Sequence, residues 1–228
     1  MPNIRRGSAQ PPNRVIRNGA EITRIMRGTV EHWVNYREEE VLLTTATTHD
    51  LSVPSWCKHI DIIMLGGGGG GAAGNGGNNT SGDGGGSGSY LHAPVDRPSG
   101  LAVTVRVGKG GRGSYTAGPG NEEDGESSRL WIGGSLIYEA PGGIKASSGS
   151  RLGGSPGNRS FAGHTMHGGT PATGGPFSGS AAAPGGVSTP PGAGGPGGSG
   201  GLFGRYQHGG DGARGEVWIR MRSGPRPA

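Results

Sequence analysis

The sequence predicts an all-β protein in which a small N-terminal β-meander precedes a domain of packed, extended polyglycine II helices clamped by short β-strands. Two observations predict this class. Of the 228 residues, 54 are Gly and 17 are Pro, whereas only 30% are hydrophobic and 5% aromatic. Side chains alone therefore cannot fill one close-packed core for a chain of this length. In addition, short runs of β-branched and aliphatic residues interrupt and bracket the glycines, and such runs favour strand pairing.

The glycines are concentrated in one region, since 50 of the 54 lie between residues 66 and 215. They occur as pairs and runs, beginning with six in succession at residues 66–71, so the uninterrupted three-residue repeat of a collagen triple helix is excluded. Such a composition is also typical of disordered chains. Strand-like runs within the region argue against disorder, and they lie at residues 101–107, 130–132, 136–138 and 216–221. The remaining class is a fold held by backbone hydrogen bonds.

Polyglycine supplies a physical model for such a fold. Glycine chains can form left-handed helices with three residues per turn, and without Cβ atoms these helices can approach closely enough to bond to one another. Ordering glycine costs about 0.5–1 kcal/mol per residue more than ordering alanine, so strands at both ends must clamp the array. We expect residues 60–65 to pair with residues 216–221. The residues expected to carry this structure are Gly66, Gly67, Gly68, Gly69, Gly70, Gly71, Ile62, Met64, Val217 and Ile219.

The first 37 residues have a different pattern, with turn signals between short strand-like runs. Asn18-Gly19 is a strong hairpin signal, and it separates residues 15–17 from residues 21–26, after which residues 29–36 form the third run. Such a three-stranded meander is too small to be stable alone, so we expect it to dock on the following domain or on another chain. The predicted organisation is an N-terminal arm and β-module (1–37), a glycine-rich domain (38–222) and a C-terminal tail (223–228).

Charge and cysteine content narrow the function classes. The net charge is +5, but cations and carboxylates alternate along the chain and form no basic patch, so nucleic-acid binding is not expected. Cys57 is the single cysteine, which excludes an intrachain disulfide, and its apolar neighbours predict a buried thiol. No run approaches the roughly 20 apolar residues of a membrane span, so we expect no membrane insertion.

Four segments resemble the glycine-rich domain of bacteriophage tail proteins. They are Val53-Pro54 and residues 60–71, 103–111 and 209–219, and the resemblance covers residues 41–222. Residues 14–33 resemble the short β-module in minor tail proteins of phages that infect high-GC actinobacteria. The resemblance implies a structural virion protein of the phage tail, a minor tail protein at or near the tail tip, with other phage tail proteins as partners. In related phage adhesins, packed polyglycine helices present distal loops that touch the host.

No motif predicts an enzyme or a cofactor site. The sequence around Gly108-Lys109 lacks the frame of a phosphate-binding loop and no helix follows it. His164 and His167 are weak candidates for metal ligands, because two imidazoles need further ligands, which three copies about a trimer axis could supply. A solvated loop is the preferred interpretation of this pair. The acidic residues 121–126 are interpreted as a solvated hairpin tip, so we expect no catalytic residues, no cofactor and no resident metal.

The leading hypothesis is therefore a structural tail protein, and we expect a homotrimer because symmetric assemblies reuse one surface patch. The alternative is an adhesin whose distal loops bind bacterial cell-wall glycan, which would require exposed aromatic residues at one end of the domain. A cellular glycine-rich RNA-binding or wall protein is disfavoured because Arg-Gly-Gly clusters are missing. The candidates for partner contact, all expected in Gly/Pro-rich loops, are His92, Tyr115, Phe161, Phe177, Phe203 and Tyr206.

Overall fold

The computed structural model describes residues 15–17, 20–22, 24–27, 30–34, 37–96, 102–146, 150–172, 182–183, 186 and 188–224. Over these ranges the chain forms strands and no helix, so the predicted all-β class is confirmed for the described residues, and no helix there could cross a membrane. The strands are β1 (Val15–Arg17), β2 (Ala20–Ile22), β3 (Arg24–Arg27), β4 (Val30–Val34), β5 (Glu38–Leu43), β6 (Thr48–Leu51), β7 (His59–Leu65), β8 (Tyr90–Asp96), β9 (Val103–Arg106), β10 (Ser128–Ile132), β11 (Ser135–Ala140), β12 (Asn158–Phe161), β13 (His164–His167), β14 (Ala182–Ala183), β15 (Tyr206–Gln207) and β16 (Glu216–Arg222). All pairs are antiparallel except β14 with β15.

The N-terminal module consists of two hairpins. The strands on either side of Asn18-Gly19, β1 and β2, pair with each other, and β3 pairs with β4. Residues 21–26, expected as one strand of a meander, are divided between β2 and β3, which belong to different sheets. Within the part of the module that the structure describes, each strand therefore pairs with one neighbour in sequence.

Two four-stranded sheets form the base of the glycine-rich domain, in the orders β5-β16-β7-β8 and β11-β10-β9-β6. Their inner faces share one apolar core, to which β7, β9, β10 and β16 contribute most of the buried side chains. The pairing of β7 with β16 predicted from the sequence is present, with Ile62 opposite Ile219 and Met64 opposite Val217. All four side chains are fully buried, so β7 and the last strand of the domain, β16, are joined at the centre of its core.

Cys57 and one ion pair lie beside this core. Cys57 is buried, as predicted, and its thiol lies 3.4 Å from the carbonyl oxygen of His59. Asp61 and Arg222 are also buried and face each other across β7 and β16, where the guanidinium donates two bonds of 2.8 and 2.9 Å to the carboxylate. Such a bidentate bond satisfies both charges inside the protein.

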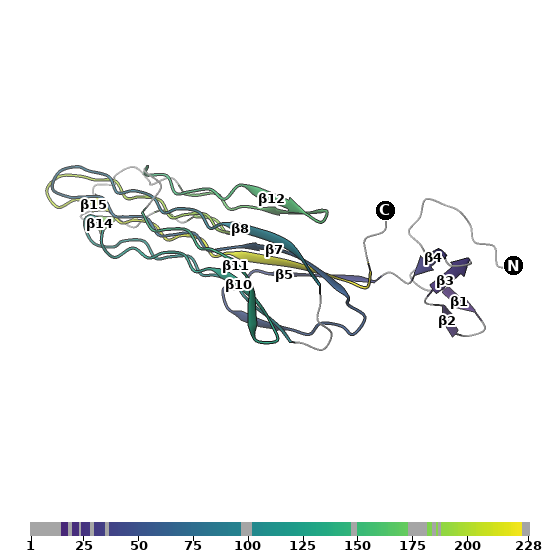
Figure 1. Ribbon diagram of the computed structural model, residues 1–228. Helices are drawn as coiled ribbons and strands as arrows, with labels where there is room; N and C mark the ends of the chain where they lie inside the picture. The colour runs from purple at the N-terminus through teal and green to yellow at the C-terminus, as the bar shows by residue number, and fades with distance from the viewer. Residues whose placement is uncertain are drawn as a thin grey trace.

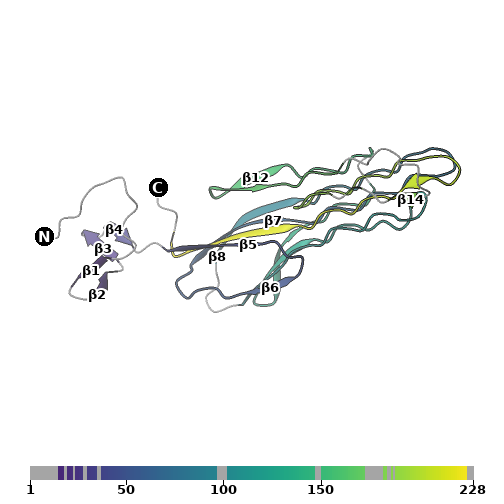
Figure 2. The ribbon, with the colours of Figure 1, turned by 180° about the vertical axis from the view of Figure 1, so that it is seen from behind.

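Beyond the sheets, the strands continue as glycine-rich segments that run side by side along the domain (Figure 1). The same bundle is seen from behind in Figure 2, with the sheets near one end and β14 at the other. Residues 66–75, which follow β7, occupy the middle of this bundle and make backbone hydrogen bonds to six other segments. The backbone N–H groups of this segment donate to the carbonyl groups of three other segments. One segment accepts from residues 66, 69, 72 and 75, through residues 89, 86, 83 and 80 respectively. A second accepts from residues 67 and 70, through residues 126 and 123, and a third accepts from residues 68, 71 and 74, through residues 213, 210 and 207.

The carbonyl groups of the central segment repeat the same period of three. They accept from the N–H groups of three further segments. Residues 143 and 146 donate to residues 67 and 70. Residues 111, 114 and 118 donate to residues 68, 71 and 74, and residues 195, 198 and 201 donate to residues 69, 72 and 75. Every third residue thus bonds to the same neighbour. Burial of the peptide groups is compensated by bonds to other segments, which is how buried backbone must be satisfied.

The central glycines leave no room for a side chain. A Cβ atom built on any of residues 66–71 would lie 2.0–2.4 Å from a backbone oxygen of a neighbouring segment. Ala72 and Ala73 continue the same segment and are buried, so a methyl group is tolerated only beyond the six glycines. Glycine is required at residues 66–71 by the close approach of neighbouring backbones.

The hairpin β12–β13 covers the outer face of the sheet that contains β16. Met166 packs there against Ile63, Leu65 and Trp218, and the guanidinium of Arg220 donates a 2.8 Å bond to the carbonyl of Ala162 in the hairpin turn. Glu40 on β5 accepts bonds from Arg220 Nε (2.8 Å) and Trp218 Nε1 (3.1 Å).

Two opposing effects act on the pKa of Glu40. Partial burial raises this pKa, but the bonds from Arg220 and Trp218 outweigh burial and leave the pKa below its usual value of 4.5. The ionised carboxylate is thus favoured by the folded protein.

Replacing Gly70 with Ala should destabilise the domain by about 3 kcal/mol or more, because the methyl group would collide with the carbonyl of Arg112. Urea unfolding followed by tryptophan fluorescence measures this. The matched control is Gly77→Ala, whose Cβ would meet only the movable amide oxygen of Asn75 at 3.3 Å. Equal stability of the two variants would contradict close packing at Gly70.

The lowered pKa of Glu40 predicts a dependence of stability on pH. A carboxyl whose pKa is lower in the folded state stabilises the fold above its unfolded value of 4.5 and loses that contribution as pH falls through the folded value. Thermal unfolding from pH 7 to pH 3 should therefore show a smaller fall in Tm for Glu40→Gln than for the unchanged protein. Glu39→Gln, an exposed neighbour on β5, is the control and should follow the unchanged protein.

Candidate functional site

Three loops meet at the end of the domain opposite the sheets. We call this the loop end, and it consists of residues 75–80, 115–121 and 201–205. Backbone bonds join the loops to the glycine segments and to one another: Gly118 N–H to Gly74 C=O (3.1 Å), Asn79 to Gly201 (2.9 Å) and Gly204 to Gly76 (2.9 Å). Two of the loops are therefore bonded to each other, and the third, 115–121, is bonded to the end of the central glycine segment.

Three of the aromatic residues proposed for partner contact gather at the loop end. Tyr115 is 53% exposed and Phe203 is 96% exposed. The hydroxyl of Tyr206, which lies in β15 and not in a loop, is 3.5 Å from the carbonyl of Tyr115, and its ring is 5.8 Å from that of His208. The structure thus brings together aromatic residues 91 positions apart in the sequence.

Phe203 adopts an unfavourable backbone conformation. Its φ of 57° lies in the left-handed region, which costs a bulky residue roughly 1–2 kcal/mol. Since the side chain is almost fully exposed, no packing within the described chain offsets this cost. Strained backbone conformations cluster at functional sites, so Phe203 is a candidate contact residue.

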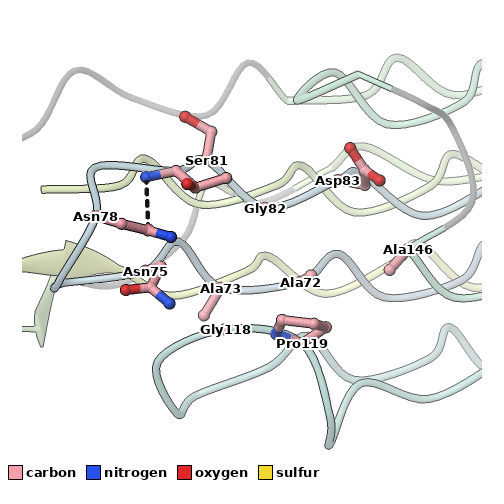
Figure 3. A pocket seen from close by; sticks show the side chains of 11 residues that line it. Ala72, Ala73, Asn75, Asn78, Ser81, Gly82, Asp83, Gly118, Pro119 and Ala146 are labelled. Atoms are coloured by element: carbon pink, nitrogen blue, oxygen red, sulfur yellow. Dashed lines mark hydrogen bonds between the residues drawn. The ribbon is translucent and has the colours of Figure 1, made fainter.

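A hollow of about 280 Å³ lies where residues of the loop end meet the glycine segments (Figure 3). Two turn amides on its rim are held in place, since Asn75 Oδ1 accepts from Gly77 N–H (2.7 Å) and Asn78 Oδ1 accepts from Thr80 N–H (3.2 Å). This hollow was not predicted from the sequence, although the asparagines that follow the first glycine run were a signal for it. The lining residues are Ala72, Ala73, Asn75, Asn78, Thr80, Ser81, Gly82, Asp83, Gly118, Pro119 and Ala146.

The other candidates for partner contact lie elsewhere. His92 belongs to β8 and Phe161 to β12, so their expected place in loops is wrong. Their rings lie 4.9 Å apart where the hairpin β12–β13 meets the sheet, because strand pairing of the flanking residues outweighs the local loop-like composition. Phe177 lies outside the described residues.

The histidine pair is also placed differently from the expectation. His164 and His167 lie in β13 and not in a solvated loop, and the ring of His164 stacks on Trp218 at 4.3 Å with an angle of 8° between the planes. Residues three apart in a strand point to opposite faces, so this pair cannot bind one ion from within β13. Over the ranges that the structure describes, no group of three or more His, Cys, Asp and Glu residues could hold a metal ion.

The acidic residues 121–126 form part of the bundle and not only a hairpin tip. The carbonyls of Glu123 and Glu126 accept bonds from the central glycines, and the carboxylate of Glu126 pairs with Arg106 at 2.7 Å. Glu122 is buried and accepts a 2.8 Å bond from Gly120 N–H. The interpretation as a solvated tip was wrong because these residues contribute their backbone to the array while several side chains point outward.

Relief of strain at Phe203 should be measurable. Phe203→Asn should raise the free energy of unfolding by about 1 kcal/mol, because Asn tolerates the left-handed region and little packing is lost. Thermal unfolding of the full chain checks this. A fall in stability would show that the ring is packed in the folded protein.

Comparison with known proteins gives one family. The model of the glycine-rich domain family matches residues 44–222, a range that begins just after β5 and ends with β16. No curated protein matches the chain. The matched range contains the sheet β11-β10-β9-β6, three of the four strands of the other sheet, the hydrogen-bonded glycine segments and the loop end. The chain belongs to the glycine-rich domain family.

Proposed function

We propose that the protein is a structural virion protein, a minor tail protein at or near the tip of a phage tail. The observation that carries the proposal is that the two chain ends of the domain lie at the sheet end, whereas the loops lie at the opposite end. The chain enters and leaves at the sheet end, where Ser223 N–H bonds to Arg37 C=O (3.0 Å) and Arg37 N–H to Ser223 Oγ (2.8 Å). The loop end is opposite, so attachment through the N-terminal module leaves it free to project. The sequence resemblance of residues 14–33 and 41–222 to tail proteins supports the same function.

We also propose that the glycine segments are polyglycine II helices. The support is the hydrogen-bond period of three, which equals the three residues per turn of that helix. At about 3.1 Å per residue, residues 66–75 would span about 30 Å. A bundle of such helices makes a stiff spacer between the sheet end and the loop end, which suits a projecting tail component.

The N-terminal module is proposed to dock the protein on another tail subunit in a homotrimer. Its two sheets have two strands each, and isolated two-stranded hairpins are marginally stable in water. Pairing with a neighbouring subunit would supply the missing contacts. Three-fold assembly would place three loop ends at the same tip.

The second candidate function is a host-surface adhesin that binds bacterial cell-wall glycan. A specific observation favours it: Tyr115 and Phe203 are exposed together at the loop end. Aromatic faces can stack on sugar rings, and aromatic side chains contribute strongly to many interfaces. The two candidates are compatible, because a tail protein can also contact the host.

Antibodies against the full chain should label purified virions at the tail tip in electron micrographs. The isolated full-length protein should have the mass of a trimer in analytical ultracentrifugation. Absence of the protein from virions would contradict the tail proposal, and a monomer at all concentrations would contradict the trimer.

Binding of the full-length protein to host cells, lost in the double variant Tyr115→Ala/Phe203→Ala, would support the adhesin over a purely structural component.

A further inference from the structure

We propose that the hollow at the loop end is a binding site for a neutral saccharide, an inference that rests on the adhesin candidate and names the ligand class and the subsite. The first argument is the chemistry of the lining. Methyl and pyrrolidine groups contribute one part of it, and Pro119 lies beside Ala72 and Ala73 in Figure 3. Amide, hydroxyl and carboxylate groups contribute the rest, from Asn75, Asn78, Thr80, Ser81 and Asp83.

The charge of the lining residues argues against anionic ligands, namely those that carry phosphate or carboxylate groups. Among the described residues that line the hollow there is no Lys, Arg or His, and Asp83 is the one ionisable residue. Phosphate groups and carboxylates are recognised by cations or by clustered backbone N–H groups. The carboxylate of Asp83 at this rim would repel such anionic ligands. A ligand that is neutral and rich in hydroxyl groups fits the lining.

The polar groups can serve a sugar hydroxyl as both donors and acceptors. The side-chain oxygens of Asn75 and Asn78 accept bonds from the turn backbone, which directs each NH₂ group to donate away from it. Asp83 is exposed and accepts hydrogen bonds, and the hydroxyls of Thr80 and Ser81 do both. A pyranose ring presents hydroxyls at its edge and C–H groups on its faces, which match this rim and the small apolar groups.

The site is preorganised by the backbone array. Ala72 donates to Asp83 C=O (2.8 Å) and accepts from Gly198 (2.9 Å), while Asn75 donates to Thr80 C=O (2.8 Å) and accepts from Gly201 (3.0 Å). Binding therefore orders few additional groups, which lowers its entropic cost. A volume of about 280 Å³ is at the lower limit of ligand pockets, so the site takes one or two sugar rings of a longer glycan.

The matched substitutions Asn78→Asp and Asn79→Asp test the proposal. Both add the same charge to the same turn, but only Asn78 lines the hollow. In Asn78→Asp a carboxylate oxygen can still accept from Thr80 N–H, so the turn is retained while the NH₂ donor is lost. Asn79 has a positive φ of 58°, which Asp also tolerates. Equal melting temperatures of the two variants would establish that both are folded.

The probes are glucose, galactose, mannose, arabinose, rhamnose and N-acetylglucosamine, with glucose 6-phosphate as the anionic comparison, each titrated into full-length protein and followed by NMR. We expect millimolar binding of at least one neutral sugar, weakened tenfold or more by Asn78→Asp and less than twofold by Asn79→Asp. Absence of binding by all neutral sugars at 50 mM, equal weakening by both variants, or preference for glucose 6-phosphate would each overturn the inference. Host-cell binding that survives Asn78→Asp would retain the adhesin and reject this subsite.

Discussion

The close approach of glycine backbones is the constraint on which the rest of the structure depends. Residues 66–75 bond to six neighbouring segments, and a Cβ on any of residues 66–71 would lie within 2.4 Å of a backbone oxygen. Interior space that side chains fill in most proteins is here filled by peptide groups, and their hydrogen bonds replace much of the apolar burial. Because glycine loses more conformational freedom on folding than other residues, the array depends on an additional source of stability.

The sheets at one end supply that stability. Strand β7 continues into the central segment, and residues 207–215 lead into strand β16. Because β7 and β16 pair in a fixed register, the two glycine segments are aligned with each other. The two strands pack together through Ile62, Met64, Val217 and Ile219 in the shared core. Once the strands are paired, the glycine segments that continue from them are already aligned. The array in turn holds the loops at the opposite end, so a rigid surface is built at a distance from the apolar core.

Much of this could be predicted from the sequence, because the apolar run at 60–65 and the glycine runs have clear physical consequences. The neighbours of each glycine segment could not, since glycine has no side chain to encode register and the pairing follows from the turns. Residues 121–126 were misinterpreted because their carboxylates indicate solvent, whereas their carbonyls accept bonds from the array. His164 was misplaced because its contact with Trp218 joins residues far apart in sequence. The hollow depends on loops from three parts of the chain and has no local signal beyond its asparagines.

Amide hydrogen exchange of the central segment tests the account most directly. If residues 66–72 and 74 are the centre of a hydrogen-bonded core, their amides should exchange as slowly as those of β7 and β16, through opening of the whole domain. Resolved by NMR, these glycines should remain protected for as long as Ile62 and Ile219. Exchange of the central amides at the rate of an unfolded chain, while the strands remain protected, would contradict a core built from backbone hydrogen bonds.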